Sequence, residues 1–521
     1  MSDRMASRAE GLQQGKALRA RTPRELHADL HGPLDRNAVA ILAEGDASRV
    51  PELLPERYRR MAANAFAFLR GAAAVMANDL ARQPTAGAPV QACGDCHLMN
   101  FGAFSTPEDN ILFDINDFDE TLPGVDFTVD LKRLAASVAV AAKAADMADR
   151  RARSLVANTV GAYREHMLGL MALSPLEIWH SRIDLEAEVK RIESPQLRRS
   201  LATLIARVRA VGLTKDDNFP HLVAGAEPRI VDKPPTIFHF GQDADPRHKI
   251  DAAGAFKRYR ASLPPERAVL VDRYQLKDLA FKAVGVGSVG TFCCAGLFMS
   301  GDDEPLFLQV KEAQNSVLER LAPGLAYHGP QGRRVVEGQR MMRAASDTLL
   351  GWTSDKASER QFYVRILKNR RLGDVSEIVE QEALTDYARL CGRTLARSHA
   401  RLGDPAVIAG YMGRSDAFDD ALASFAMAYA EQTTIDHAAL VKAKGSAPSE
   451  GAAGKAAAAA RPLNPRRACR SRRPMPARLC QSNGRSPAHG AARPDPSGAV
   501  RLRGRSTWPR RRSAFVCKPG V

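Results

Sequence analysis

The chain has 521 residues and a formal net charge of +16, with 75 Lys and Arg side chains against 59 Asp and Glu. The positive charge is concentrated at the C-terminal end, because residues 442–521 hold 4 Lys and 15 Arg against only Glu450 and Asp495, a net charge of +17. Residues 1–441 therefore carry a net charge of −1, which argues against a body that binds nucleic acid specifically, since such domains are themselves basic.

The apolar runs and the cysteines exclude two further classes of protein. Residues 1–22 lack the apolar segment of a secretory signal peptide. The longest apolar stretch, residues 134–145, is interrupted by Lys143 and is too short to span a membrane. Five cysteines precede the basic end, and this odd number, with Cys293 adjacent to Cys294, favours reduced thiols over disulfides. We therefore expect a cytoplasmic location and no membrane partner.

In chain order, residues 1–55 form a polar lead-in with several prolines. Apolar periodicity then predicts a helix over residues 56–83, and a second helical region covers residues 128–212. Residues 213–265 are rich in Pro and Asp and predict a linker or an irregular insertion. We group residues 56–265 as one helical lobe, which also contains an acidic segment.

The acidic segment, residues 94–120, reads GDCHLMNFGAFSTPEDNILFDINDFDE and spaces acidic and amide side chains as phosphoryl-transfer enzymes do. In kinase-type sites an Asp orients the acceptor hydroxyl, an Asn five residues later holds a metal ion, and an Asp after the next strand holds Mg²⁺ between phosphates. Asp95, Asn100 and Asp117 follow that order. Asp119 is a further candidate metal ligand, because carboxylate and amide oxygens suit Mg²⁺.

Other interpretations of this segment stay open. One is that Asp95 and Asn100 cap a turn while the later acids form a solvated loop. The sequence Cys93-Gly-Asp-Cys96-His97 also matches the pattern for covalent haem, which requires export, and a closed zinc site would need a second pair of soft ligands. We favour a role for His97 in orienting the loop, as the His does in the similar H-G-D-x-H-x-x-N loop of aminoglycoside-type phosphotransferases.

A second motif lies in a strand-rich region, residues 266–375. The stretch from residue 277 to residue 313 predicts strand, glycine turn, strand, acidic turn and strand. Strand-like sequence on both sides makes the glycine turn similar to the glycine loop of kinases rather than to the helix-opening turn of a dinucleotide site. The turn carries four candidate nucleotide-binding residues, Gly285, Gly287, Ser288 and Gly290.

Lys311 ends the third predicted strand and resembles the kinase lysine that contacts the nucleotide phosphates. Glu337 lies near the start of a predicted helix over residues 335–350, so we expect it to bind the nucleotide site through an ion pair with Lys311. The alternative is a β-hairpin with glycine turns and an exposed lysine.

The two motifs occur in the reverse of the order found in ordinary kinases, where the glycine loop and the lysine precede the catalytic Asp. A circular permutation reconciles them, because a site assembled in space does not depend on chain order. Residues 362–369 then predict the strand before the hinge, and residues 376–441 the helices that complete the helical lobe. In this arrangement we expect Asp117 to lie across a cleft from Lys311, between a few ångströms and about ten away.

Residues 442–521 are rich in Ala, Pro, Gly, Ser and Arg and have almost no apolar periodicity. Such a composition buries too little apolar surface to offset chain entropy, so we predict a disordered basic tail. Its abrupt onset is typical of a shifted reading frame or of added sequence. Nonspecific binding to acidic polymers follows from its charge.

The chain as a whole resembles an uncharacterised bacterial family, Domain of Unknown Function 2252, over about residues 15–440. The resemblance is carried by blocks in one order, among them RYRRM (57–61), CGDCHLMNFG (93–102), FDINDFDET (113–121), VGVGSVGT (284–291), LFLQVKEA (306–313), RVVEGQR (334–340), FYVR (362–365) and LARSHAR (395–401). Residues 63–66 and 366–368 depart from the sequence expected of the family. The family label implies no activity.

These features predict an α+β, two-lobed, protein-kinase-like fold, circularly permuted, with the helical lobe first and the nucleotide-binding lobe second. The expected activity is transfer of the γ-phosphoryl group of ATP, with Mg²⁺, to a hydroxyl acceptor that no motif identifies, and no motif indicates an oligomeric state. Two alternatives stay open: a catalytically silent nucleotide-binding regulatory protein, and a metal-dependent hydrolase that uses only the acids of residues 116–120.

Overall fold

The computed structural model divides into two units, Met1–Ser449 and Glu450–Val521. It describes residues 6–30, 34–106, 108, 110–210, 220–223, 228–234, 236–240, 250–283, 289–367 and 381–444. Every element described below therefore belongs to the first unit. The predicted basic tail beyond residue 444 lies outside the described residues.

The helical region is built around α6 (Phe127–Ala144), which is buried along its length from Phe127 to Ala142. Small and apolar residues occur on every side of this helix, which is the pattern expected of a helix covered all round. The other long helices of the core are α7 (Asp149–Met171), α15 (Gln381–Ala400) and α17 (Ala417–Lys444). Since α15 and α17 each pack against both α6 and α7, residues from both ends of the unit share one hydrophobic core.

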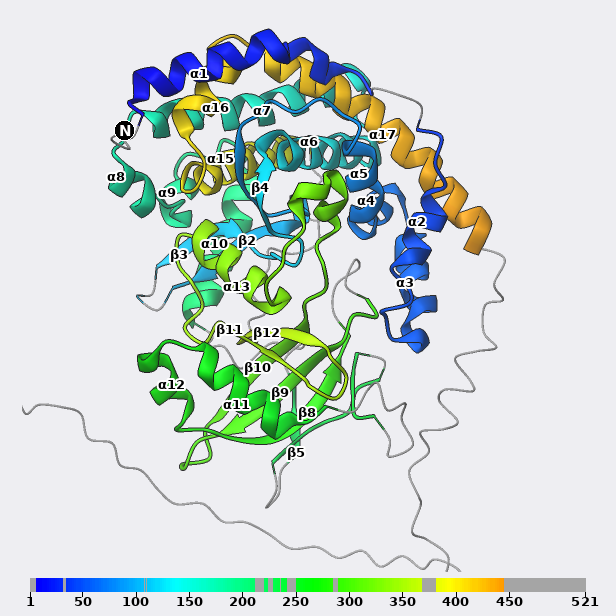
Figure 1. Ribbon diagram of the computed structural model, residues 1–521, viewed down its shortest axis with the longest axis vertical. Coiled ribbons are helices and arrows are strands. Elements are labelled where there is room, and N and C mark those ends of the chain that lie inside the picture. Colours follow the sequence, from blue (N-terminus) through cyan, green and yellow to red (C-terminus); the bar gives the residue numbers. More distant parts are fainter. Residues whose placement is uncertain are drawn as a thin grey trace, which may run out of the picture. The chain divides into compact units, whose positions relative to one another are not determined.

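The first helix, α1 (Arg8–Arg21), lies along α16 (Pro405–Met412), as Figure 1 shows. Gly15 permits this close approach, because a Cβ atom at that position would come within 2.1 Å of the Val407 carbonyl oxygen. The polar lead-in predicted for residues 1–55 therefore contains a helix that packs against the C-terminal helices.

Three short helices replace the single helix predicted over residues 56–83. They are α3 (Leu54–Met61), α4 (Ala65–Gly71) and α5 (Ala73–Leu80). Asn64 caps α4, since its side chain accepts a hydrogen bond from the amide of Ala67. Ala72 leaves helical geometry, with φ of −111° and ψ of 33°, and so separates α4 from α5.

Two antiparallel strand pairs carry the acidic segment. β1 (Pro89–Ala92) pairs with β4 (Leu122–Asp126), and β2 (Phe101–Ser105) pairs with β3 (Ile111–Ile115). A 3₁₀ helix, η3 (Leu98–Asn100), precedes β2. The predicted acidic site residues therefore lie on the loops that follow β1 and β3.

The large sheet is antiparallel, with the strand order β11-β12-β10-β9-β8-β7. Its strands are β7 (Ile237–Phe238), β8 (Gln275–Lys282), β9 (Cys293–Met299), β10 (Pro305–Glu312), β11 (Gly351–Ser354) and β12 (Gln361–Ile366). Helix α13 (Gln331–Met342) follows β10 and packs against β11 and β12 on one side and against β1 and β4 on the other. Figure 1 shows α13 between the green sheet and the helical region.

Helix α11 (Ala252–Ser262) lies in the stretch predicted as a linker or insertion. It packs against β11, and its Tyr259 hydroxyl donates a hydrogen bond to the Leu349 carbonyl oxygen at 2.6 Å. Together with α12 (Pro265–Val271), this helix packs with the strand-rich region, although the predicted boundary at residue 266 separates it from the sheet.

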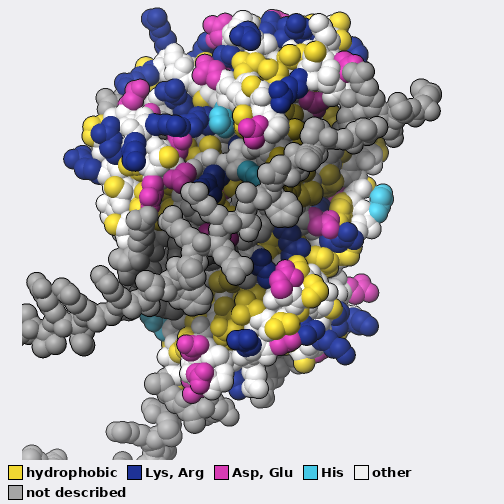
Figure 2. Space-filling view, turned by 90° about the vertical axis from the view of Figure 1, so that its left-hand side faces the viewer, with side chains coloured by type: hydrophobic (Ala, Val, Ile, Leu, Met, Phe, Trp, Pro, Cys, Tyr) yellow, Lys and Arg dark blue, Asp and Glu magenta, His cyan; other side chains and the backbone are white. Residues whose placement is uncertain are grey.

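The structure confirms the predicted α+β class. The remaining elements are η1 (Arg24–Ala28), α2 (Ala38–Glu44), η2 (Pro51–Leu53), α8 (Pro175–His180), α9 (Leu185–Val189), α10 (Pro195–Ala210), β5 (Leu222–Val223), β6 (Arg229–Ile230), η5 (Val317–Leu321) and η6 (Pro323–Leu325). None of the described helices is both long and apolar enough to cross a membrane. On the face drawn in Figure 2, Lys and Arg side chains are interspersed with Asp and Glu, in keeping with the small net charge of residues 1–441.

Candidate functional site

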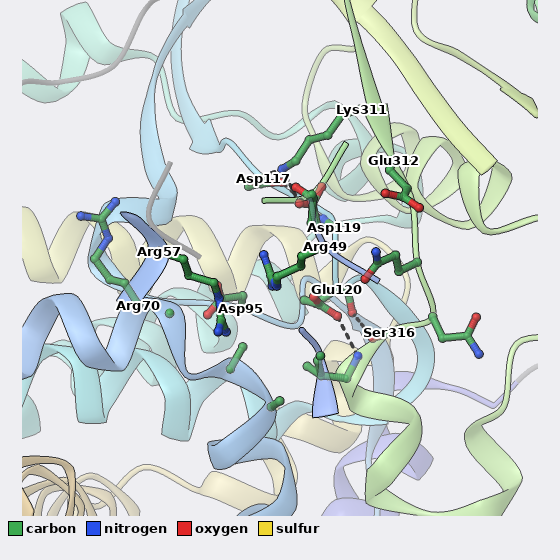
Figure 3. A pocket seen from close by; sticks show the side chains of 18 of the residues that line it. Arg49, Arg57, Arg70, Asp95, Asp117, Asp119, Glu120, Lys311, Glu312 and Ser316 are labelled. Atoms are coloured by element: carbon green, nitrogen blue, oxygen red, sulfur yellow. Dashed lines mark hydrogen bonds and ion pairs between the residues drawn. The ribbon is translucent and has the colours of Figure 1, made fainter. Parts of the chain in front are cut away.

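A cavity of about 860 Å³ lies where the acidic loops, strand β10 and helices α2 to α5 meet. Figure 3 shows part of its lining. The predicted site residues that line it are Asp95, His97, Asn100, Asp117, Asp119 and Lys311. The structure therefore brings both sequence motifs to one place.

The backbone at Asp95 makes a sharp turn after β1. Gly94 adopts a φ of +93°, and a Cβ atom there would come within 2.2 Å of the Glu120 carbonyl oxygen, so the turn requires glycine. The buried Asp130 carboxylate on α6 accepts hydrogen bonds from the amides of Cys93 at 2.7 Å and Gly94 at 2.9 Å. Helix α6 thereby fixes the position of the loop.

Within the described part of the chain, the Asp95 carboxylate accepts side-chain hydrogen bonds at one of its two oxygens. Arg133 on α6 donates to its Oδ1 atom, from Nε at 3.0 Å and from Nη2 at 2.7 Å. The other oxygen, Oδ2, lies 3.7 Å from Nε2 of His97. Burial lowers the pKa of His97 to about 3, so its ring is neutral near pH 7 and adds no positive charge to the loop.

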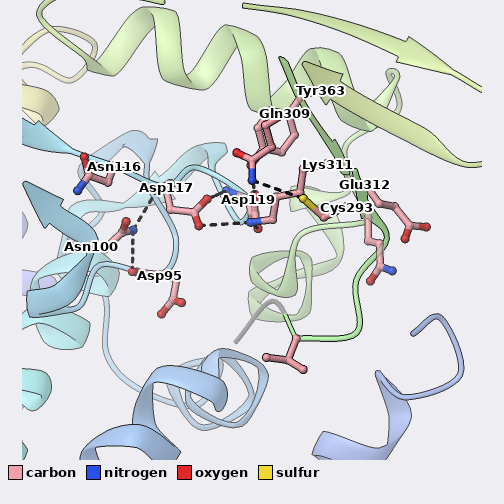
Figure 4. Close-up of polar contacts among 12 residues, drawn as sticks. Asp95, Asn100, Asn116, Asp117, Asp119, Cys293, Gln309, Lys311, Glu312 and Tyr363 are labelled. Atoms are coloured by element: carbon pink, nitrogen blue, oxygen red, sulfur yellow. Dashed lines mark hydrogen bonds and ion pairs between the residues drawn. The ribbon is translucent and has the colours of Figure 1, made fainter. Parts of the chain in front are cut away.

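Asn100 joins the two acidic loops. Its side-chain amide donates hydrogen bonds to the backbone carbonyl oxygens of Asp95 at 3.1 Å and Asp117 at 3.0 Å, as Figure 4 shows. This pairing fixes the orientation of the side chain, because the reverse orientation would set three carbonyl oxygens against one another. The Oδ1 atom of Asn100 is thus the end that remains for a ligand.

Lys311 reaches from the sheet to the acidic loop. Its ammonium group lies 3.4 Å from Oδ2 of Asp117 and contacts Oδ2 of Asp119 more closely (Figure 4). Tyr363, which is paired with Lys311 across β10 and β12, donates its hydroxyl to the other Asp119 oxygen at 2.8 Å. The prediction that Asp117 lies between a few ångströms and about ten from Lys311 is confirmed.

The charges of this cluster depend on one another. Burial by itself would lower the pKa of Lys311, but the carboxylates of Asp117 and Asp119 raise it well above its ordinary value. Burial and the neighbouring Asp117 raise the pKa of Asp119. The lysine is therefore charged. The two carboxylates repel each other, and a divalent cation would stabilise them.

Helix α13 anchors the acidic loop, but through a different residue from the one predicted. Glu337 forms an ion pair with Arg333 at 2.7 Å, so the predicted pair of Glu337 with Lys311 is wrong. Positions 333 and 337 share the exposed face of α13, because residues four apart lie on the same side of a helix. On the buried face, Arg334 donates to three backbone carbonyl oxygens, those of Thr121 at 2.5 Å, Asp119 at 2.8 Å and Gln314 at 2.8 Å.

The predicted glycine turn is described only in part. Gly285, Gly287 and Ser288 lie outside the described residues. Gly290 has a φ of +87°, a conformation that favours glycine. β8 and β9, the described strands before and after it, are antiparallel neighbours, so the segment that contains the predicted turn joins two strands, as the sequence predicts.

Residues 49–443 match the family described as "Uncharacterized protein conserved in bacteria (DUF2252)". The chain belongs to this family. The matched residues include both acidic loops, the sheet and Lys311, so the predicted site residues that line the cavity of this DUF2252 protein lie within the family region, whereas the lining residues of α2 precede it. No curated protein and no solved structure matches the chain.

The arginines of this DUF2252 site were not predicted from the sequence. Arg133 holds Asp95, and Arg49, Arg57 and Arg70 line the cavity. Arg133 had a usable signal, since a charged side chain within a predominantly apolar helix requires a partner if the helix is buried. Arg57 and Arg70 come from the stretch whose pattern predicts one continuous helix, and the breaks between the short helices decide where their side chains point. Arg49 belongs to the predicted polar lead-in, where no motif marks it.

Among the described residues, no group of three or more His, Cys, Asp and Glu side chains is arranged to hold a metal ion. Asp117 and Asp119 supply two carboxylates, and Asn100 supplies one amide oxygen. Mg²⁺ is usually held by one or two carboxylates, with water and substrate phosphates completing its shell. The site of this DUF2252 protein therefore suits a cation that arrives with a phosphate ligand better than one that the protein holds alone.

Proposed function

We propose that this DUF2252 protein is a phosphotransferase that moves the γ-phosphoryl group of ATP, with Mg²⁺, to a hydroxyl acceptor. The observation that carries the proposal is the contact of Lys311 with Asp117 and Asp119, because it sets a strand lysine against an acidic loop inside one cavity. A kinase-type site needs a lysine for the nucleotide phosphates and an Asp and an Asn for the metal.

The strand that carries Lys311 supports the proposal. Lys311 lies on the third strand of the β8-β9-β10 meander, and the helix α13 follows that strand. Kinases likewise carry this lysine on the third strand, after a glycine loop and before a helix. Because the Asp95 loop precedes the sheet in this chain, the proposed kinase-like arrangement is circularly permuted.

In the proposed reaction, Asp95 orients the acceptor hydroxyl and accepts its proton. Arg133 occupies Oδ1 of Asp95, so Oδ2, beside His97, is the oxygen that remains for the acceptor. Phosphoryl transfer depends mainly on alignment and on neutralisation of phosphate charge, so one fixed carboxylate near the acceptor suffices.

The proposed metal ligands are Asp117, Asp119 and Oδ1 of Asn100. Mg²⁺ at this position would neutralise the charge of the transferred phosphoryl group. Lys311, which forms ion pairs with both carboxylates in the structure, is within reach of phosphates bound beside them. A cytoplasmic setting, where ATP is abundant, suits a chain whose five described cysteines are all free.

A second candidate function is that of a nucleotide-binding regulatory protein that transfers nothing. One observation favours it: Lys311 pairs with the candidate metal ligands themselves, while Glu337 points elsewhere. Hydrolysis by the acidic loop alone is less well supported, because it would leave Lys311 and the glycine turn without a role.

Formation of ADP by the full-length protein tests the proposal. With ATP and Mg²⁺ we expect slow ADP formation that Asp117→Asn reduces at least about tenfold, since loss of a metal ligand should cost no less than loss of an outer-shell partner. Asp272→Asn, at the exposed end of α12, is the matched control. Nucleotide binding without turnover would favour the regulatory protein, and turnover that Asp117→Asn leaves unchanged would contradict the proposed site.

A further inference from the structure

The cavity contains arginines that the proposed transfer chemistry does not use. Arg49 lies just before η2, and Arg57 and Arg70 lie on α3 and α4. Figure 3 shows Arg49 and Arg57 beside Asp95 and below Asp117 in that view. The wall of the cavity next to Asp95, the residue proposed to orient the acceptor hydroxyl, is therefore basic.

Arg49 forms no ion pair with any of the described residues. Its Nη1 atom donates to the Val289 carbonyl oxygen at 2.6 Å, and its Nε atom is buried without a hydrogen-bond partner in the described part of the chain. Burial and the neighbouring Arg57 lower the pKa of Arg49 to about 10. A guanidinium group in this situation gains from a bound anion, because burial of an uncompensated charge is unfavourable.

Arg57 is almost completely buried, and its ion pair with Asp46 uses only Nη1, at 3.1 Å. The same Asp46 carboxylate also accepts a hydrogen bond from the Tyr58 hydroxyl at 2.5 Å. Within the described ranges, Nε of Arg57 has no hydrogen-bond partner. One carboxylate therefore serves two donors, and Arg57 keeps hydrogen-bonding capacity for a ligand.

The acidic side chains nearby are already engaged. Asp95 is paired with Arg133, and Glu120 accepts a hydrogen bond from the Val317 amide at 2.7 Å. Neither carboxylate forms an ion pair with Arg49 or Arg57 among the described residues. The two arginines therefore both line the cavity, and each has an Nε atom without a hydrogen-bond partner among the described residues.

We propose that Arg49 and Arg57 bind a phosphate group of the acceptor, so that the substrate is a phosphorylated compound with a free hydroxyl. This inference rests on the proposed phosphotransferase function and names its substrate class. Guanidinium groups offer paired donors that match phosphate oxygens, and the charge of Arg49, which has no ion-pair partner among the described residues, offsets part of the charge of a phosphate monoester near pH 7. A polycationic acceptor such as an aminoglycoside would be repelled by these arginines.

Arg49 lies beside the described end of the glycine turn, since its Nη1 atom donates to the Val289 carbonyl oxygen, so it is the position of Arg57 that favours the acceptor over the nucleotide as the source of this phosphate. The nucleotide phosphates of a kinase-type site lie between the glycine turn and the strand lysine. In Figure 3, Arg57 lies on the Asp95 side of the pocket, away from Lys311. A phosphate bound there would place the rest of the acceptor toward Asp95.

Calorimetric titration with inorganic phosphate tests the inference. The full-length protein is titrated alone and after saturation with Mg²⁺ and a non-hydrolysable ATP analogue, and so are the variants Arg49→Gln and Arg57→Gln. Arg59→Gln is the matched control, because Arg59 lies on the same helix with a side chain that is 72% exposed. We expect phosphate to bind in the presence of the analogue, and each cavity variant to weaken this binding about tenfold or more, as expected for lost hydrogen bonds to a charged group.

Thermal unfolding shows which variants fold. If one cavity variant loses its cooperative transition, the other decides the result. Displacement of phosphate by the analogue, or equal phosphate affinity in wild type and both cavity variants, would overturn the inference while leaving the proposed function standing. A wild-type protein that binds no nucleotide would instead overturn the proposed function, and loss of phosphate binding in Arg49→Gln would then still support an anion site at these arginines.

Discussion

Asp95 follows Gly94 in a backbone turn that requires glycine, and the buried Arg133 holds the Asp95 carboxylate. The amides around it bind Asp130, and its Oδ1 binds Arg133, so both contacts come from α6. Such double support reduces the freedom of the side chain, which is the property needed of a group that must meet an acceptor hydroxyl in one orientation. Oδ2, which lies beside His97, is the oxygen that meets the acceptor hydroxyl in the proposed mechanism.

Asp95→Asn should therefore abolish turnover and leave nucleotide binding intact. The variant keeps the size of the side chain but removes the base, and general base catalysis contributes roughly 10²- to 10⁴-fold. Steady-state ADP formation measures the loss, and calorimetry with a non-hydrolysable ATP analogue measures the affinity. Turnover equal to that of the wild type would exclude the assigned role of Asp95.

Lys132, next to Arg133 on α6, is buried in the helical core. Its ammonium group donates to the Pro84 carbonyl oxygen at 3.2 Å and lies 5.0 Å from the centre of the Phe425 ring. Burial lowers the pKa of Lys132 from 10.5 to about 7. Between these two values the unfolded chain binds the proton more tightly than the folded protein, so the free energy of unfolding rises with pH through this window.

Lys132→Met should remove that contribution to the pH dependence. Relative to the variant, the wild type should gain on the order of 3–4 kcal/mol of stability between pH 7 and pH 10, because each unit of pH between the two pKa values corresponds to about 1.4 kcal/mol. Urea denaturation of both proteins at several pH values measures the difference. Parallel stability profiles would show that Lys132 keeps an ordinary pKa in the folded state.

At the scale of elements, α13 connects the sheet to the acidic loop. Its buried face carries Arg334, and Gly338 on the same face lies so close to the loop that a Cβ atom would come within 2.4 Å of the Thr121 side chain. Its outer face carries the exposed pair of Arg333 and Glu337. The helix therefore positions the loop through hydrogen bonds from Arg334 to backbone carbonyl oxygens rather than through an ion pair with Lys311.

Arg334→Met should destabilise the protein by about 3 kcal/mol, because it leaves buried carbonyl oxygens without donors. Arg333→Met on the exposed face of the same helix should change stability little. Chemical denaturation compares the two variants. If both variants lose the same amount of stability, the hydrogen bonds of Arg334 stabilise the fold no more than the exposed Arg333 does.

The sequence predicts the parts of this site whose spacing is local. Asp95 and Asn100 are five residues apart on one loop, and Lys311 ends a strand that its own pattern reveals. The direction of Glu337 was not predictable in the same way, because α13 begins at Gln331 and packing against the loop decides which side of the helix faces inward. The breaks in the predicted 56–83 helix likewise depend on contacts distant in sequence. These breaks decide where Arg57 and Arg70 point.

At the scale of the first unit, the helices on either side of the sheet region belong together. α6 and α7 precede the sheet in the chain, α15 and α17 follow it, and all four share one core. The sheet region is therefore inserted within one helical body, and α13 holds its inner edge against the acidic loops. This connectivity explains how a lysine 194 residues beyond Asp117 reaches the same cavity.

The central claim is that Lys311 and Asp117 serve one bound nucleotide, and calorimetry with Mg²⁺ and a non-hydrolysable ATP analogue tests it most directly. We expect Lys311→Met and Asp117→Asn each to weaken binding about tenfold or more, and the double variant to weaken it by less than the product of the two effects, since groups in contact act together. Glu337→Gln, on the exposed face of α13, should bind as the wild type does. Unchanged affinity in both single variants, or a loss in Glu337→Gln as large as theirs, would contradict the account.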